Sequence, residues 1–135
     1  MSNIVQIKRR TRLYPVIALL LLSALTASIG QVAFKKGMSL IGIVVVEYNI
    51  SFLVTITKAL FTPYVFSGLL FYALSTLLWL IALSRCSLNF AYPFTAITFV
   101  LVILLSVVIL KEPIPISRIL GMAIIIGGIF IVSLK

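Results

Sequence analysis

Four long apolar runs, none interrupted by a charged side chain, make up most of this chain of 135 residues. They are Leu13–Phe34, Ala59–Ser84, Cys86–Leu110 and Ile119–Leu134. About 20 apolar residues in a helix, rising about 1.5 Å each, match the hydrocarbon core of a bilayer, which is about 30 Å thick. Three of the runs reach that length and the fourth is close to it. The pattern therefore predicts an all-α membrane protein with four transmembrane helices.

The composition supports a bilayer as the solvent of this chain and narrows its chemistry. Hydrophobic residues make up 63% of the chain and charged residues 10%, so a soluble core of this size could not bury the apolar surface. The sequence has no histidine, one cysteine (Cys86) and two acids (Glu47 and Glu112). A metal site built from His and Cys, and general acid–base catalysis, therefore lack their usual residues. We expect no enzyme, no catalytic residue, no metal and no cofactor.

The net charge of +9 is distributed in a way that favours a lipid surface over nucleic acid as the partner. Lys8, Arg9, Arg10 and Arg12 precede the first span, and most other cations stand singly at span ends, where they can reach lipid headgroups. The positive-inside rule puts this basic segment in the cytoplasm, and four spans return the C-terminus to the same side. The remaining cations give only a weak bias, so an antiparallel, dual-topology arrangement stays open.

Local signals at the helix ends set the bounds of the spans, because caps, prolines and cations mark helix starts and stops. The predicted caps are Gly37 after the first span, Thr62-Pro63 before the second, Asn89 before the third and Ser117 before the fourth. The predicted spans cover residues 14–34, 63–83, 90–110 and 118–134 of a single domain, 1–135. The segment from about 38 to 60 is predicted at the membrane surface, with an interfacial helix along Ile50–Leu60.

Hydroxyl and amide side chains are the polar groups that remain inside the spans. Ser28 and Gln31 are three residues apart, as are Thr95 and Thr98, so each pair shares a helix face. Such groups either hydrogen-bond across helices or line a polar groove, and the residues alone leave both interpretations open.

Glycines give a packing signal in the last span. Gly121 and Gly128 are seven residues apart, and Gly127 lies beside Gly128. A stripe of small residues lets two helices approach closely in a membrane. Four helices are also few to enclose a transport pathway, so we expect a dimer with a second copy or with a similar small subunit.

Several segments together resemble the EamA-type drug/metabolite transporter superfamily. They are WLIALSRCSLNFAYPF (79–94), LKEP (110–113), GMAIIIGG (121–128), and Gly30-Gln31 followed by Lys35 or Lys36. Within that superfamily the chain is most similar to the four-helix subunits of the aminoarabinose-phosphoundecaprenol flippase. The likeness covers nearly the whole chain except Met38–Lys58. It implies a half-transporter of the small-multidrug-resistance type, located in the bacterial inner membrane, that flips a polyprenyl-phosphate-linked sugar as a dimer.

One departure separates the chain from the small multidrug resistance transporters, which are more distant relatives with the same four-helix plan. Their first helix carries an essential glutamate three residues before the glycine matched by Gly30, and Ala27 stands at that position here. The antiport of protons against cationic drugs needs that carboxylate. Two alternatives to the flippase remain. One is an exporter of a small metabolite or drug. The other is an accessory subunit of a membrane glycosyltransferase or of a partner half-transporter.

The resemblance and the residue types give a set of candidate substrate contacts. For the sugar headgroup they are Gln31, Tyr92 and Thr95, and for the phosphate they are Lys35, Lys36 and Arg85. Glu112 either fixes the turn before the last span or contacts the headgroup at the mouth of a groove. As a turn residue it would accept backbone N–H bonds or pair with Lys111 or Arg118.

Overall fold

The computed structural model describes residues 2–44 and 50–132, and the secondary structure of this part of the chain is entirely helical. Its elements are α1 (Ser2–Ile41), α2 (Ile50–Leu60), α3 (Pro63–Leu83), α4 (Leu88–Leu105), a π-helical turn η1 (Ser106–Leu110) and α5 (Ile116–Val132). Three segments are long and apolar enough to cross a membrane: Tyr14–Ile41, Pro63–Leu83 and Leu88–Leu110. The described part of α5 is a shorter apolar helix. The prediction of an all-α, multi-pass membrane protein with about four spans is confirmed.

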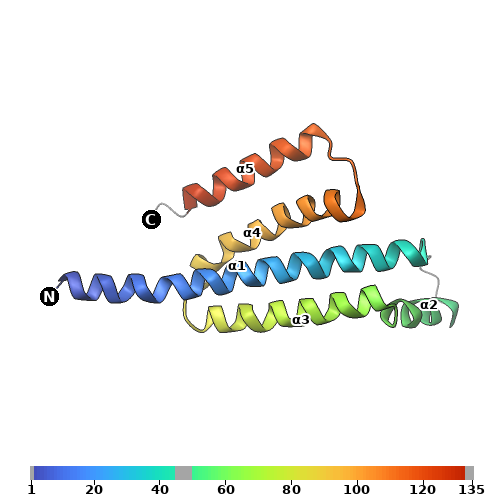
Figure 1. The fold of residues 1–135 in the computed structure, drawn as a ribbon, viewed down its shortest axis with the longest axis horizontal. Coiled ribbons are helices and arrows are strands. Elements are labelled where there is room, and N and C mark those ends of the chain that lie inside the picture. Colours follow the sequence, from blue (N-terminus) through green and yellow to red (C-terminus); the bar gives the residue numbers. More distant parts are fainter. Residues whose placement is uncertain (1, 45–49, 133–135) are drawn as a thin grey trace.

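Successive long helices run antiparallel and side by side, and α1 lies between α3 and α4. Figure 1 shows α3 on one side of α1 and α4 on the other, with α5 beyond α4. Helix α1 packs against both of its neighbours, whereas α3 and α4 make few direct contacts. Among the described elements α5 contacts only α4. The α3–α4 connection and the end of α5 lie at one end of the bundle, the first turns of α1 extend beyond that end, and α2 lies at the other (Figure 1).

Small residues at seven-residue intervals explain why α1 and α3 pack so closely. On α1 they are Ser23, Gly30 and Gly37, which continue a seven-residue series that starts at Val16. On α3 they are Gly68, Ser75 and Ala82. All seven residues, Val16 included, are buried. A seven-residue repeat keeps one face of each helix toward its partner when the pair winds with a left-handed twist. The two sets meet in antiparallel order, since Val16 belongs to the same apolar cluster as Ala82 and Ser23 bonds to Ser75.

At the centre of this stripe the two backbones touch. A Cβ added to Gly30 would lie 2.9 Å from the carbonyl oxygen of Gly68, and one added to Gly68 would lie 2.7 Å from Cδ1 of Phe34. One step along, the Ser23 hydroxyl donates to the Ser75 carbonyl at 3.1 Å, and the Ser75 hydroxyl donates to the Ser23 carbonyl at 2.9 Å. Interhelical hydrogen bonds in membrane proteins contribute about 0.6 kcal/mol each on average. Glycine packing and hydroxyl bonds thus hold α1 and α3 together.

The end of the first span differs from the predicted one. Gly37 was expected to end the first span, but it is buried against Val65 and Tyr64 of α3, and α1 continues to Ile41. The terminating glycine is Gly42, whose φ is 89° and whose N–H donates to the Met38 carbonyl at 3.1 Å. The glycine at position 37 is therefore explained by the close packing of α1 on α3 rather than by the end of a helix.

The starts of the later helices were predicted with mixed success. Thr62 and Pro63 occupy the N-cap and first helical positions of α3, as expected. The N-cap of α4 is Ser87 rather than Asn89, so the helix begins two residues earlier than predicted. Helix α5 begins at Ile116, which places Ser117 inside its first turn rather than at the cap.

The end of α4 is wound more loosely than a regular α-helix. Ser106–Leu110 form the π-helical turn, and Lys111 follows in the left-handed conformation with φ of 55°. The Lys111 N–H donates to the Ser106 carbonyl, which closes the wide turn. A left-handed lysine is unfavourable because its Cβ crowds the following carbonyl oxygen. The predicted break after Leu110 is therefore present, with a strained residue at its first position.

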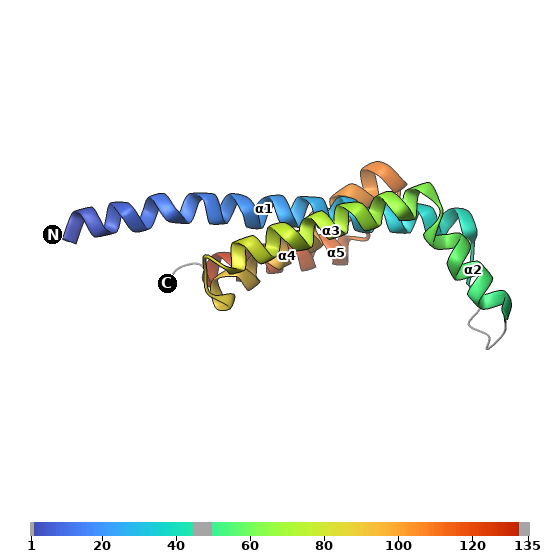
Figure 2. The same cartoon turned by 90° about the horizontal axis from the view of Figure 1, so that it is seen from below.

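The segment between α1 and α3 carries the short helix α2 at the bounds expected from the sequence, Ile50–Leu60. Figure 2 shows α2 inclined to the direction of α1 and α3. Ile50, Leu53 and Phe61 in and after it are exposed. Glu47, to which the sequence assigned no role, lies outside the described residues.

Candidate functional site

A groove lies over α1, between α3 and α4, and is the candidate site. Its volume is about 360 Å³, within the range of small-molecule sites, about 300–1,000 Å³. Because α3 and α4 hardly touch each other, α1 forms the floor and the other two helices form the walls. The residues that line the groove are Leu20, Ser23, Ala24, Ala27 and Gln31 of α1, Tyr72, Thr76 and Trp79 of α3, and Phe94, Thr95, Thr98 and Phe99 of α4.

The spacing of these residues shows how the sequence builds the groove. Leu20, Ala24, Ala27 and Gln31 follow one another at intervals of four, three and four, which places them on one helix face. This face lies next to the glycine–serine stripe that packs on α3. Two alanines on the floor leave the space that the walls do not fill. One side of α1 therefore binds α3 and the adjacent side opens into the groove.

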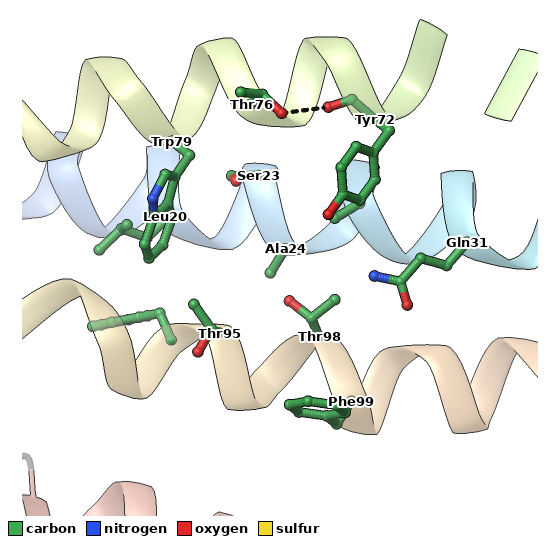
Figure 3. A pocket seen from close by; sticks show the side chains of 12 residues that line it. Leu20, Ser23, Ala24, Gln31, Tyr72, Thr76, Trp79, Thr95, Thr98 and Phe99 are labelled. Atoms are coloured by element: carbon green, nitrogen blue, oxygen red, sulfur yellow. Dashed lines mark hydrogen bonds between the residues drawn. The ribbon is translucent and has the colours of Figure 1, made fainter. Parts of the chain in front are cut away.

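Four polar groups in the groove have no hydrogen-bond partner within the described residues. They are the carboxamide of Gln31, the hydroxyls of Tyr72 and Thr98, and the indole N–H of Trp79. Figure 3 shows Gln31 extending from α1 toward α4, Thr98 facing the groove from α4, and the rings of Tyr72 and Trp79 pointing across α1. Together these groups offer both donors and acceptors to a bound molecule.

Three further hydroxyls along the groove already use their protons within the chain. Thr76 Oγ1 donates to the Tyr72 carbonyl at 2.9 Å (Figure 3). Thr95 Oγ1 donates to the Tyr92 carbonyl at 2.6 Å, and Ser23 bonds to Ser75. The lone pairs of these oxygens remain available, so the three residues can serve as acceptors.

The groove is neutral, since no Asp, Glu, Lys or Arg is among the described residues that line it. Ala27, the position matched to the glutamate of the small multidrug resistance transporters, lies on the floor and is 9% exposed. A carboxylate there would face the groove. The chain instead presents a methyl group.

Charged groups gather beyond one end of the groove. Lys35 lies four residues after Gln31, on the same side of α1, and its Nζ is 4.0 Å from Oε1 of Glu112. The side chains of Lys35 and Glu112 are 64% and 41% exposed, so their attraction is screened by solvent. This ion pair joins the end of α1 to the connection before α5. Lysine 35 is the partner of Glu112 here, where the sequence suggested Lys111 or Arg118.

The other predicted contacts lie outside the groove. Lys36 sits over the ring of Tyr64, with its Nζ 4.8 Å from the ring centre. Arg85 is exposed in the connection between α3 and α4, and this connection lies at the opposite end of the bundle from α2 (Figure 1). Tyr92 touches Trp79 edge-to-face, with the ring centres 6.4 Å apart. Tyr92 thus packs behind a lining residue, and of the predicted headgroup contacts Gln31 and Thr95 line the groove.

The sequence reasoning did not select the aromatic residues that line the groove. Tyr72 and Trp79 were not selected, although Tyr72, Thr76 and Trp79 share one face of α3 by their spacing of four and three. That face could have been found by asking which polar-tipped aromatics lie in register with Thr76. Aromatics in apolar spans otherwise give no sign of whether they meet lipid or a groove.

Helix α5 presents its glycines to open space. A Cβ added to Gly121, Gly127 or Gly128 would have no atom of the described residues within 4 Å beyond its own helix turn. None of the described residues of α5 is buried. This helix therefore has a face that one chain does not cover.

Comparisons with known proteins agree on one family. The EamA-like transporter family model matches residues 2–134. A probable 4-amino-4-deoxy-L-arabinose-phosphoundecaprenol flippase subunit ArnE of Pseudomonas aeruginosa is 31% identical over 86% of this chain and 95% of its own length. Its counterpart in Pseudomonas fluorescens is 29% identical over 82% of this chain and 90% of its own. A probable ArnF subunit of the same kind of flippase, from Proteus mirabilis, is 37% identical over 53% of this chain and 55% of its own. No solved structure matches the chain significantly.

Proposed function

Because this chain belongs to the EamA-like transporter family, we propose that it is a subunit of a flippase for a polyprenyl-phosphate-linked sugar. It acts without a covalent step in the bacterial inner membrane, with both termini in the cytoplasm. The observation that carries the proposal is a neutral, hydrogen-bonding groove of about 360 Å³ inside an apolar chain. A sugar headgroup crossing a bilayer needs such a groove, because its hydroxyls lose their water there.

The two ends of the bundle supply the phosphate contacts. Lys35 lies beyond the Gln31 end of the groove, and Arg85 lies at the other end of the bundle. Cations at interfaces bind phosphate by charge-assisted hydrogen bonds. A phosphate that moves with its sugar from one membrane surface to the other therefore meets a cation at each surface. Glu112 holds Lys35 until the phosphate replaces it as the partner.

The headgroup contacts in this proposal are Gln31 and Thr95, together with Thr98, which faces the same space. Tyr92 positions Trp79 rather than binding the sugar directly. The polyprenyl tail stays in lipid. It reaches the groove past the exposed ring of Phe99, which lies at its edge.

The working unit is a dimer, either of two copies or of this chain with a similar small subunit. Within one chain, helix α5 packs only on α4 among the described elements. Helix α5 provides the contact, and its exposed Gly121, Gly127 and Gly128 allow a second helix to approach closely.

A flipping assay tests the proposal. Protein extracted gently from its host membrane, so that any partner subunit accompanies it, is placed in liposomes with a fluorescent short-chain polyprenyl-phosphate hexose. A membrane-impermeant quencher removes the fluorescence of lipid on the outer leaflet only, so the fluorescence that is lost measures the amount of lipid on that leaflet. We expect the protein to accelerate the exchange between leaflets, and Thr98→Val to slow it several-fold by removing one hydroxyl from the groove.

The matched control is Thr57→Val, which removes the same group from α2, where the hydroxyl bonds only to the Leu53 carbonyl. It should exchange lipid at the wild-type rate. Exchange no faster than in protein-free liposomes would refute the flippase. Equal slowing by the two variants would refute the groove as its pathway.

A further inference from the structure

A second pocket, of about 350 Å³, lies between α4 and α5. Among the described elements α5 contacts α4 alone, so this pocket is on the outer side of α4 (Figure 1). Ile126 and Phe130 in its wall are exposed, so it opens to the surroundings of the bundle. The residues that line it are Ile97 and Val100 of α4 and Ile126, Ile129 and Phe130 of α5. All five side chains are hydrocarbon, and a polar ligand would lose its hydrogen bonds there.

Helix α4 separates this pocket from the groove. Successive residues of a helix are about 100° apart, so Ile97 and Val100 lie on the side of α4 opposite the hydroxyls of the groove wall. Those hydroxyls belong to Thr95 and Thr98, which alternate with the pocket residues along the chain. All four residues lie near the middle of the span Leu88–Leu110. The pocket and the groove are therefore at the same depth in the membrane, separated by one helix about 10 Å thick.

The pocket is too small for a helix of a second subunit. A helix about 10 Å across would fill about 350 Å³ in less than one turn. The close contact between subunits is also expected elsewhere on α5. Gly128 is two residues from both Ile126 and Phe130, which is about 200° around the helix. The stripe of Gly121 and Gly128 therefore faces away from the pocket, and a dimer formed through it leaves the pocket open to lipid.

We propose that this pocket binds a stretch of the isoprenoid tail of the lipid whose headgroup occupies the groove. The proposal rests on the proposed flippase function and adds a site for the tail to it. The lipid around the protein is as apolar as the pocket, so the preference comes from van der Waals contact rather than from transfer out of water. Branched and aromatic side chains form an uneven wall, and a chain with regular methyl branches contacts it more closely than a straight acyl chain does.

Phe99 marks the path of the tail from the groove to the pocket. It lines the groove, its ring is 64% exposed, and the next residue, Val100, lines the pocket. A lipid with its sugar in the groove therefore has its tail within one turn of α4 from the pocket. In this arrangement the groove recognises the sugar and the pocket recognises the isoprenoid.

Photochemical labelling tests the tail site in the intact protein, extracted with any partner subunit and placed in lipid nanodiscs. The probe is geranylgeranyl phosphate with a diazirine in its tail; it has no sugar, so labelling reports the tail alone. Mass spectrometry of the peptides should place the label at residues 97–100 of α4 and 126–130 of α5. Unlabelled geranylgeranyl phosphate should compete several-fold better than a straight-chain alkyl phosphate of equal carbon number.

Two matched variants locate the site. Ile126→Trp places a larger ring in the pocket, and we expect it to lower the labelling several-fold. Ile119→Trp makes the same change seven residues earlier on the same face of α5, outside the pocket. The two isoleucines are 53% and 49% exposed, so neither substitution forces volume into a packed interior. Ile119→Trp should keep the wild-type labelling.

The outcomes separate the tail site from the function on which it rests. Label spread evenly over the exposed residues of the spans, or equal labelling of the two variants, would overturn the tail site and leave the flippase to the exchange assay. Equal competition by the straight-chain phosphate would also overturn it, because the pocket would then accept the acyl chains of bulk lipid. Localised labelling of a protein that exchanges no lipid would support the isoprenoid site and refute the flippase alone.

Discussion

Replacing Gly30 by alanine is expected to weaken the contact between α1 and α3. The new methyl carbon would lie 2.9 Å from the carbonyl oxygen of Gly68 and 3.3 Å from the backbone nitrogen of Tyr72. Both atoms belong to the backbone of α3, so neither can rotate away as a side chain would. The two helices must move apart, and the contacts along their shared stripe loosen.

The size of the effect follows from two opposing contributions. Forcing extra volume into a packed interior costs about 1–3 kcal/mol, whereas alanine in place of glycine favours a helix by up to about 1 kcal/mol. We expect a net loss of about 1–2 kcal/mol in the free energy of unfolding for Gly30→Ala. The control is Ala73→Leu, which adds apolar volume at an exposed position of α3 outside the groove.

The measurement is unfolding of the purified protein by increasing fractions of sodium dodecyl sulfate in mixed micelles. Trp79 reports it, since its ring packs against the apolar cluster that includes Val16 and Ala82. Gly30→Ala should unfold at a lower fraction of the denaturing detergent than the wild type does, and Ala73→Leu should not. A Gly30→Ala protein as stable as the wild type would show that the helices do not approach as closely as described.

Three further predictions concern other contacts. Ser23→Ala and Ser75→Ala should each lower the free energy of unfolding by about 0.6 kcal/mol. The double variant should lose less than the sum, because the two hydroxyl oxygens are themselves within hydrogen-bond distance, at 3.2 Å; strict additivity in this double-mutant cycle would argue against the bond between them. Glu112→Gln should lower the free energy of unfolding by less than about 1 kcal/mol. This loss should diminish in high salt, since the carboxylate faces Lys35 in a solvent-exposed pair. A loss insensitive to salt would point to another role for Glu112. Burial raises the pKa of the Cys86 thiol, so the unreactive protonated form persists to higher pH than for a free cysteine. Its labelling by a maleimide should be slow at neutral pH and rise on the alkaline side, and fast labelling at neutral pH would contradict this.

The sequence predicted the helices well because their signals are local. Span length depends only on apolar composition, and the start of α3 depends on two adjacent residues, Thr62 and Pro63. Gly37 shows the limit of that reasoning. Its place after two lysines suggests a helix end, but its contact with Val65 on a helix distant in the sequence determines its role.

The groove was also predicted in part, because some of its lining residues carry a local signal in the sequence. Gln31 and Thr95 stood out as polar residues in apolar spans, and both line the groove. Lys35 and Glu112 are far apart in the sequence, and no spacing rule could have paired them. Nor could one reveal that Tyr72 and Trp79 line the groove while Phe66 of the same helix is exposed, because that depends on which side of α3 meets α1.

The backbone contact at Gly30 and Gly68 also bears on how the chain can move. Two helices that touch along an interdigitated stripe form a rigid frame, since sliding or tilting would break contacts at every step. Helix α4 contacts α1 less extensively than α3 does, and it ends in the wide π-helical turn before the left-handed Lys111. Alternating access requires one part of a transporter to rock against another around a fixed site. In this chain the part expected to move is therefore α4 with α5, about the connection at residues 84–87, with α1 and α3 as the stationary support.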